Sequence, residues 1–283
     1  MNVYSTKKLG EGRYLISERH HPDSDHVVNI GLVVGNEKAA VIDTGFGVTD
    51  TLRSYIEAIT DKPLVCLATH GHPDHVGAAA LFDEVYMNDR DAVLLPVSLS
   101  YERRMGDVFG RPGYDEALYE YCKEHIVDGS NFTYKNMDEG DVFDLGGVKL
   151  EVIAVPGHTQ GSVVLLNRAE NYIYIGDAVG KRNALVNLPP EKRVGLQAYR
   201  DGLRKLISVM NDETELYYGH STELFPHSYV RDMERAVTEV LDGKTENDKD
   251  SVSHFAKRLA ASNKKMREHT CGDVILVYDA NTL

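Results

Sequence analysis

Short apolar runs separated by turn residues dominate the first third of the chain. They cover residues 13–17, 27–34 and 39–43, with Gly35, Asn36 and Gly45 as the breaks. Apolar runs of this length bounded by Gly and Asn are typical of β-strands, so we expect antiparallel strands here. A helix capped by Thr49 or Asp50 should follow, and residues 64–68 then predict a buried strand.

The middle of the chain breaks this rhythm. Between about residues 90 and 135, aromatic and apolar side chains recur at helical spacing on both sides of a Gly-Arg-Pro-Gly turn at 110–113. We interpret this segment as a helical insertion that forms a lid over a functional site. The alternative is that its apolar side chains only pack against their own domain.

The rest of the chain alternates strands and helices. We predict further strands at 84–87, 148–155, 162–166, 172–175, 215–218 and 273–278, and helices at 76–82, 196–210, 229–241 and about 252–268. The polar stretch 242–250 indicates a surface linker. We therefore expect one α/β domain at 1–243, with a helix and a strand at 244–283 appended to it.

Composition narrows the class of partner. Of the 283 residues, 42% are hydrophobic, which suffices for a sizeable core. The formal net charge of -13 opposes binding to nucleic acid and to anionic membranes, so we expect a small-molecule substrate. Cys66, Cys122 and Cys271 are too few and too widely spaced for a disulfide framework or a zinc-binding thiolate pair. Since no apolar leader follows Lys7 and Lys8, we expect a soluble cytoplasmic protein. The sequence does not determine the oligomeric state, and a homodimer is one option.

The strongest chemical signal follows the predicted strand at 64–68. In the sequence Thr-His-Gly-His-Pro-Asp-His, which begins at residue 69, the potential ligands are His70, His72, Asp74 and His75. Imidazole and carboxylate groups bind zinc and other divalent first-row ions. One such histidine is more often a solvated turn residue, but four potential ligands within six positions favour a metal site. The turn at the proline lets the two halves of the motif face neighbouring points, so two metals can share the loop.

Three distant positions repeat this placement. His158, Asp177 and His220 each follow a glycine that comes just after a predicted strand. Glycine permits the tight turn that lets a side chain project from a strand end. Each residue alone also fits a turn or a hydrogen-bonded core position. Together with the motif, they predict one metal centre.

This pattern resembles the metallo-β-lactamase superfamily, whose His-x-His-x-Asp-His motif and later His, Asp and His are matched over roughly residues 10–240. Glyoxalase II-like and lactonase-like hydrolases are the broad type that it resembles most. The resemblance implies a four-layer αββα sandwich with two divalent metal ions at one edge of its sheets, zinc being expected and manganese or iron being alternatives. It assigns His70, His72 and His158 to the first metal, Asp74, His75 and His220 to the second, and Asp177 to both. Asp43 resembles the family's supporting acidic residue, although a turn cap is an equally simple interpretation.

The chemistry that two adjacent cations supply is hydrolysis. A water between them loses its proton near neutral pH, and the hydroxide attacks a carbonyl or phosphoryl centre. We expect Asp74 to act as a catalytic residue as well, by orienting this water or carrying a proton. Lys181 and Arg182 lie close in sequence to Asp177 and are candidates for binding a substrate carboxylate, or else are simply solvated.

We predict hydrolysis of a small ester, thioester, lactone or amide. The missing export signal argues against a secreted β-lactamase, and the acidic charge argues against a ribonuclease. The carboxy-terminal part does not resemble the all-helical glutathione-binding domain of glyoxalase II. The alternatives are a mono-iron enzyme similar to persulfide dioxygenases, a phosphodiesterase, or a binding protein that keeps the ligands with little turnover.

Overall fold

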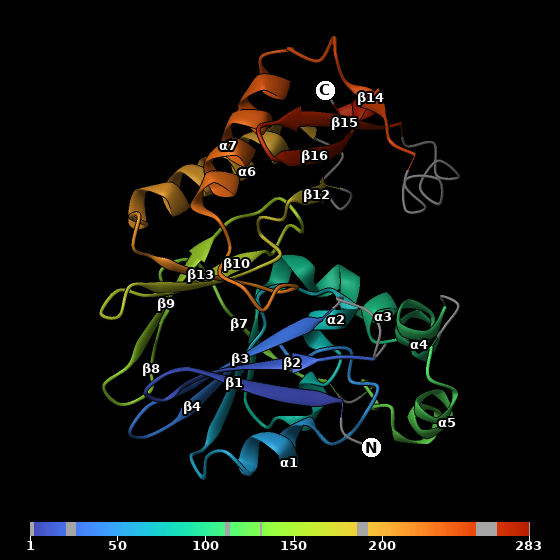
Figure 1. Ribbon diagram of the computed structural model, residues 1–283, viewed down its shortest axis with the longest axis vertical. Helices are drawn as coiled ribbons and strands as arrows, with labels where there is room; N and C mark the ends of the chain where they lie inside the picture. The colour runs from blue at the N-terminus through green and yellow to red at the C-terminus, as the bar shows by residue number, and fades with distance from the viewer. Residues whose placement is uncertain are drawn as a thin grey trace.

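The computed structural model describes residues 3–20, 27–110, 114–130, 132–185, 192–252 and 265–282. Two β-sheets pack face to face near the middle of the molecule, and a smaller third sheet lies at one end (Figure 1). Helices cover the outer faces of the two central sheets.

The first central sheet is built from the amino-terminal part of the chain. Its strands, in spatial and chain order, are β1 Tyr4–Gly10, β2 Arg13–Glu18, β3 Val28–Val34, β4 Ala39–Ile42, β5 Leu64–Leu67, β6 Val85–Met87 and β7 Lys135–Asn136. The strands expected between residues 13 and 87 are confirmed to within one residue at each end. Strand β1 is missing from the prediction because Ser5 to Lys8 are exposed, as suits an edge strand with little apolar patterning.

The second central sheet has the spatial order β13-β11-β10-β9-β8. Its strands are β8 Val142–Asp144, β9 Lys149–Ala154, β10 Val163–Asn167, β11 Tyr172–Gly176 and β13 Glu215–Tyr218. Leu15 and Leu67 of the first sheet pack with Val152, Leu165 and Tyr174 of the second in a shared buried layer. Burial of this layer from both sides fixes the two sheets against each other.

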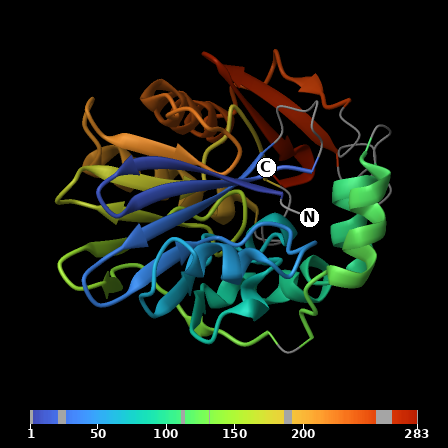
Figure 2. The same ribbon diagram turned by 60° about the horizontal axis from the view of Figure 1, so that its bottom comes forward.

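Helices close the sandwich from both sides, as Figure 2 shows. The first sheet packs against α1 Leu52–Glu57, α4 Tyr101–Phe109 and α5 Glu116–His125, and the second against α6 Lys192–Val209 and α7 His227–Leu241. The predicted αββα architecture is therefore confirmed. In the described part of the chain, every helix is too short or too polar to cross a bilayer.

The third sheet packs on α7 and differs from the prediction for the carboxy terminus. Its order is β12-β16-β15-β14, with β12 Arg182–Leu185, β14 Lys249–Asp250, β15 Met266–Cys271 and β16 Val274–Asp279. Most of the predicted helix at 252–268 lies outside the described residues. Its last three positions are wrong, because they belong to β15, which forms a hairpin with β16 through Gly272 at φ 57°.

Short helical turns occupy the loops near the strand ends. They are α2 Pro73–Val76, the 3₁₀ turns Ala79–Leu81 and Asp89–Leu94, and α3 Leu95–Ser98; a last 3₁₀ turn, Ala280–Thr282, ends the chain. The helix predicted at 76–82 thus begins earlier and is interrupted. Pro73 explains the early start, because proline favours the first helical position.

The insertion predicted at 90–135 is helical, and one buried cation attaches it to the core. Arg104 of α4 is 2% exposed and donates to the backbone carbonyls of Gly47, Gly77 and Val127, among others. Burial lowers the pKa of its guanidinium to about 10, which still leaves it charged at neutral pH.

We predict that Arg104→Met destabilises the protein by about 3 kcal/mol, because several buried carbonyls lose their donor at once. Urea unfolding of the metal-loaded protein measures this loss. The control is Arg103→Met, since the half-exposed Arg103 pairs with Asp107 on the same helix and should contribute less than about 0.5 kcal/mol. Equal unfolding midpoints for the two variants would contradict the assigned role.

Candidate metal centre

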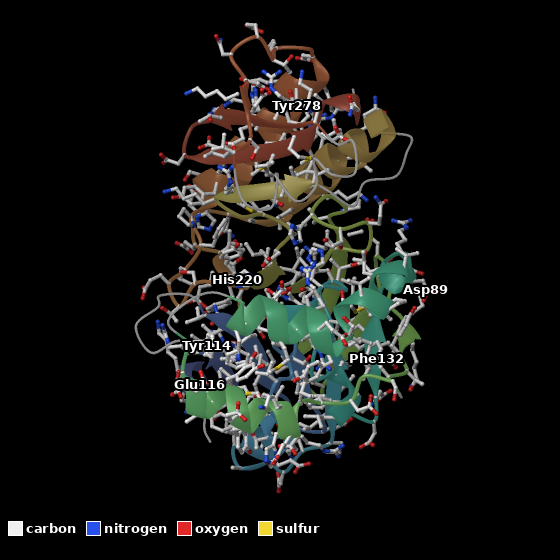
Figure 3. All side chains as sticks on the ribbon, turned by 90° about the vertical axis from the view of Figure 1, so that its right-hand side faces the viewer. Asp89, Tyr114, Glu116, Phe132, His220 and Tyr278 are labelled. Atoms are coloured by element: carbon white, nitrogen blue, oxygen red, sulfur yellow. The ribbon has the colours of Figure 1, made fainter. Side chains whose placement is uncertain are left out.

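The predicted ligands all lie where strands end. Strand β5 leads into His70, β11 ends just before Asp177, and β13 ends just before His220, while His158 lies in the turn between β9 and β10. Strands β11 and β13 are parallel neighbours, so their carboxyl ends meet. Figure 3 shows His220 at the level where the carboxy-terminal part of the chain faces the helices of the insertion. The centre therefore lies at one edge of both central sheets.

Three imidazoles form the first group. His72 Nδ1 lies 3.1 Å from His70 Nε2 and 2.9 Å from His158 Nε2. Burial, together with the neighbouring His158, lowers the pKa of His72 to about 3. Burial also holds the pKa of His70 well below its ordinary value. Burial lowers the pKa of His158 as well, so all three imidazoles can offer a neutral nitrogen to one ion.

The second group combines carboxylates with imidazoles. Asp74 Oδ2 lies 3.3 Å from His220 Nε2 and 3.7 Å from His75 Nε2. Asp177 joins the two groups, because its Oδ2 lies 3.0 Å from His220 Nε2 and 3.8 Å from His158 Nε2. The structure thus brings all seven predicted ligands together, because Asp177 also groups with His70 of the first cluster and His75 of the second.

Two buried atoms in this cluster have no hydrogen-bond partner among the residues that the structure describes. They are His75 Nε2 and Asp177 Oδ1, which face each other at 3.7 Å. An unsatisfied buried polar atom costs about 1–3 kcal/mol, so two of them facing one point need an explanation. A divalent cation between these atoms would satisfy both, and a nitrogen with a carboxylate oxygen suits zinc.

The charges around the second group also favour a cation. Burial lowers the pKa of His75, but the carboxylates of Asp43, Asp74 and Asp177 outweigh it and raise the pKa to about 9. Burial likewise opposes protonation of His220, yet Asp177 and Asp74 raise its pKa to about 10. A bound metal ion would take the place of these protons, since it compensates the same carboxylates.

Asp43 holds the histidine motif from behind. Its Oδ2 accepts from His75 Nδ1 at 2.8 Å, and its Oδ1 accepts from the backbone N–H of Thr69 at 2.7 Å. Its backbone has a positive φ of 63°, so the residue occupies a tight turn as well. Both interpretations of Asp43 therefore describe the structure: it forms a turn, and its carboxylate orients His75 so that Nε2 faces the centre.

Asp91 is a component of the site that sequence reasoning missed. It is 0% exposed, its Oδ2 accepts from Gly71 N at 2.8 Å and from Thr159 Oγ1 at 2.7 Å, and its Oδ1 accepts from Gly161 N at 2.8 Å. Burial raises the pKa of this carboxyl, and the three donors oppose that rise. One carboxylate thus ties the loop of His70 and His72 to the loop of His158.

Asn183 and the backbone of Val27 orient two further ligands. Asn183 Oδ1 lies 3.2 Å from His158 Nδ1, and His220 Nδ1 lies 2.9 Å from the carbonyl oxygen of Val27. Hydrogen bonds to the second ring nitrogen fix the ring orientation of metal-binding histidines. Neither partner carries a ligand-like signal in the sequence, because a lone Asn and a backbone carbonyl occur in any loop.

The two predicted substrate contacts are placed outside the cluster. Arg182 begins β12 and pairs through both terminal nitrogens with Glu268 of β15. Lys181 is exposed, and its carbonyl oxygen accepts from Ile275 N at 2.8 Å. Arg182 therefore helps to hold the third sheet, and Lys181 remains a candidate contact for substrate.

Known proteins share this sequence pattern and this fold. The family model of the metallo-beta-lactamase superfamily matches residues 23–245. The acyl-coenzyme A thioesterase MBLAC2 of Gallus gallus is 31% identical over 191 residues, which cover 62% of this chain and 66% of that protein, slightly under two thirds of its length. The hydroxyacylglutathione hydrolase GloC of Haemophilus influenzae is 26% identical over 201 residues, covering 69% of this chain and 85% of that protein.

A solved structure supports the fold independently. A metallo-beta-lactamase from Pontibacter korlensis superposes with a TM-score of 0.56 at 17% sequence identity, covering 83% of this chain and 99% of that one. At this identity the likeness concerns the fold alone, and the family assignment rests on the sequence match. The chain belongs to the metallo-beta-lactamase superfamily.

Proposed function

We propose that this protein is a metal-dependent hydrolase that uses two metal ions to cleave a small thioester. The observation that carries the proposal is the pair of ligand clusters that share Asp177. The thioester is favoured among the predicted substrates because the names of two relatives, an acyl-coenzyme A thioesterase and a hydroxyacylglutathione hydrolase, both denote hydrolysis of an acyl–sulfur bond.

The proposed metal sites follow the two clusters. His70, His72 and His158 would hold the first ion, Asp74, His75 and His220 the second, and Asp177 both. Zinc is the expected metal, with manganese or iron as alternatives. Bound ions of this kind supply a nucleophile at neutral pH and stabilise negative charge on the substrate oxygen.

The protein's own residues then control water and protons. Asp74 Oδ2 lies 3.3 Å from His220 Nε2 and 3.7 Å from His75 Nε2. Because the Asp74 side chain is 19% exposed, it can also reach a water at the centre. We propose that Asp74 orients this water and passes its proton on toward the leaving sulfur. Asp43 keeps His75 in one ring orientation throughout, because its hydrogen bond to Nδ1 does not involve the substrate.

We predict that protein purified without added metal carries about two zinc or manganese ions per chain. The His158→Ala variant should hold less metal, because it removes one nitrogen from the first cluster. Elemental analysis measures both contents. One iron per chain in the wild type would instead support the alternative of a mono-iron enzyme similar to persulfide dioxygenases, and sulfur compounds would then be screened as substrates of oxidation.

Hydrolysis of a short-chain acyl-coenzyme A and of an acyl-glutathione tests the proposed reaction directly. We expect release of free thiol by the wild type and a loss of at least about 100-fold in kcat for Asp74→Asn, because a positioned proton carrier typically contributes this much. Because Asp74 is also a proposed metal ligand, we expect some loss of thermal stability in this variant, but a far smaller loss than the loss of turnover. Absence of thiol release from both thioesters, in protein that carries two metals, would contradict the proposal.

We predict that Asp91→Asn weakens metal binding by about 10- to 100-fold. In this variant an NH₂ group replaces one carboxylate oxygen, so a donor would face the N–H donors of the two ligand loops. Competition with a metal-sensitive dye measures the affinity. The control is Asp89→Asn, since Asp89 belongs to the same 3₁₀ turn but lies exposed at the surface (Figure 3). A wild-type affinity for Asp91→Asn would show that the two ligand loops hold their positions without it.

A further inference from the structure

Tyr218 is an aromatic residue beside the metal centre, and the proposed chemistry assigns no role to it. It is the last residue of β13, two positions before His220. Its neighbour Tyr217 points between the two sheets and donates to Glu215 Oε2 at 2.7 Å. Tyr218 points to the other face of the strand, where its ring packs against Phe225 with centroids 5.0 Å apart.

Two contacts fix the position of the Tyr218 ring at the centre. The ring lies edge-on to the imidazole of His220, with centroids 5.5 Å apart. At the far end of the ring, a Cβ atom placed on Gly180 would lie only 3.1 Å from the Tyr218 hydroxyl. Gly180 follows Asp177 by three residues, so the phenol lies between the loop of the bridging ligand and the loop of His220.

The hydroxyl of Tyr218 makes no hydrogen bond with any residue that the structure describes, yet it is not sealed from solvent. The hydroxyls of Tyr172 and Tyr174 also lack partners, but both are enclosed in the layer between the sheets. Tyr218 is only partly buried, and its hydroxyl is not among the fully enclosed, unpaired atoms of the described residues, so part of the hydroxyl surface is open. A rigid, accessible donor beside two ligand loops is suited to bind substrate.

We propose that the Tyr218 hydroxyl donates a hydrogen bond to the carbonyl oxygen of the substrate's acyl group. This inference rests on the proposed hydrolase function. When a nucleophilic oxygen bonds to the carbonyl carbon, the π electrons of the C=O bond move to its oxygen, which becomes negatively charged. The C–S bond then breaks, the C=O bond re-forms, and sulfur leaves with the electron pair and takes a proton. The phenol, which is neutral near pH 7, stabilises the charged oxygen without giving up its own proton.

The variant Tyr218→Phe tests the proposal because it removes the hydroxyl and keeps both ring contacts. The substrates are the acyl-coenzyme A and acyl-glutathione thioesters, together with a p-nitrophenyl ester, which has the same carbonyl group. We expect kcat to fall by about 100-fold with little change in KM, because the hydrogen bond strengthens as charge develops. Metal content should equal that of the wild type.

Tyr217→Phe is the matched control, since it removes a hydroxyl from the opposite face of the same strand. We expect it to leave kcat unchanged. A Tyr218→Phe variant with unchanged kcat on a substrate that the wild type hydrolyses would overturn the role of Tyr218 and leave the hydrolase function intact. A wild type that hydrolyses none of these substrates would overturn the proposed function, and the inference with it.

Gly180→Ala provides a second, independent test of the geometry. The added methyl group would crowd the hydroxyl at 3.1 Å but not the ring carbon behind it at 3.7 Å. We therefore expect Gly180→Ala to lower kcat in the wild type and to cause no further loss in Tyr218→Phe. The same loss in both backgrounds would contradict the proposed contact.

Discussion

Buried carboxylates and imidazoles at the sheet edge set the main constraint on this structure. His70 is 1% exposed and His75 is fully buried, and the carboxylates of Asp43, Asp74 and Asp177 surround the second of them. Removing such groups from water is costly unless opposite charge and well-placed ligand atoms compensate it. Two divalent cations would supply both, so metal binding and the stability of this edge are expected to be coupled.

Two buried side chains of opposite charge connect the insertion to the loops at this edge. Asp91 accepts from the backbone of Gly71 and Gly161, and Arg104 donates to the backbone of Gly47 and Gly77. Each therefore binds loops that precede or follow ligand residues. The helices of the insertion pack on the first sheet through Met105, and this fits the interpretation that they belong to their own domain. They also hold the loops that carry the ligands.

The central strands and the candidate ligands can both be predicted from the sequence, because the ligands come directly after the apolar runs that form the strands. Strands that are buried on both faces have continuous apolar runs, and the ligands follow directly at their ends, as at Ile175 and Asp177. Asp91 gives no such signal, because its partners are backbone N–H groups and one threonine far away in the chain. The predicted helix is wrong over the first part of β15, because the adjacent polar residues Arg267 and Glu268 interrupt the apolar–polar alternation that is typical of a strand.

The charge of the protein bears on which thiol carries the acyl group of the substrate, and not on the chemistry of bond cleavage. The net charge of -13 disfavours anionic substrates at long range, whereas a coenzyme A thioester carries several phosphate charges. At physiological ionic strength, however, charges beyond about 8 Å are largely screened, so residues near the centre decide. In the described part of the chain, Arg182 is paired with Glu268, whereas Lys181 is an exposed cation beside the loop of Asp177. Under the proposed function, we therefore expect a thioester with few negative charges on its carrier to be a better substrate than one with many, although the acyl–sulfur bond that is cleaved would be the same in both.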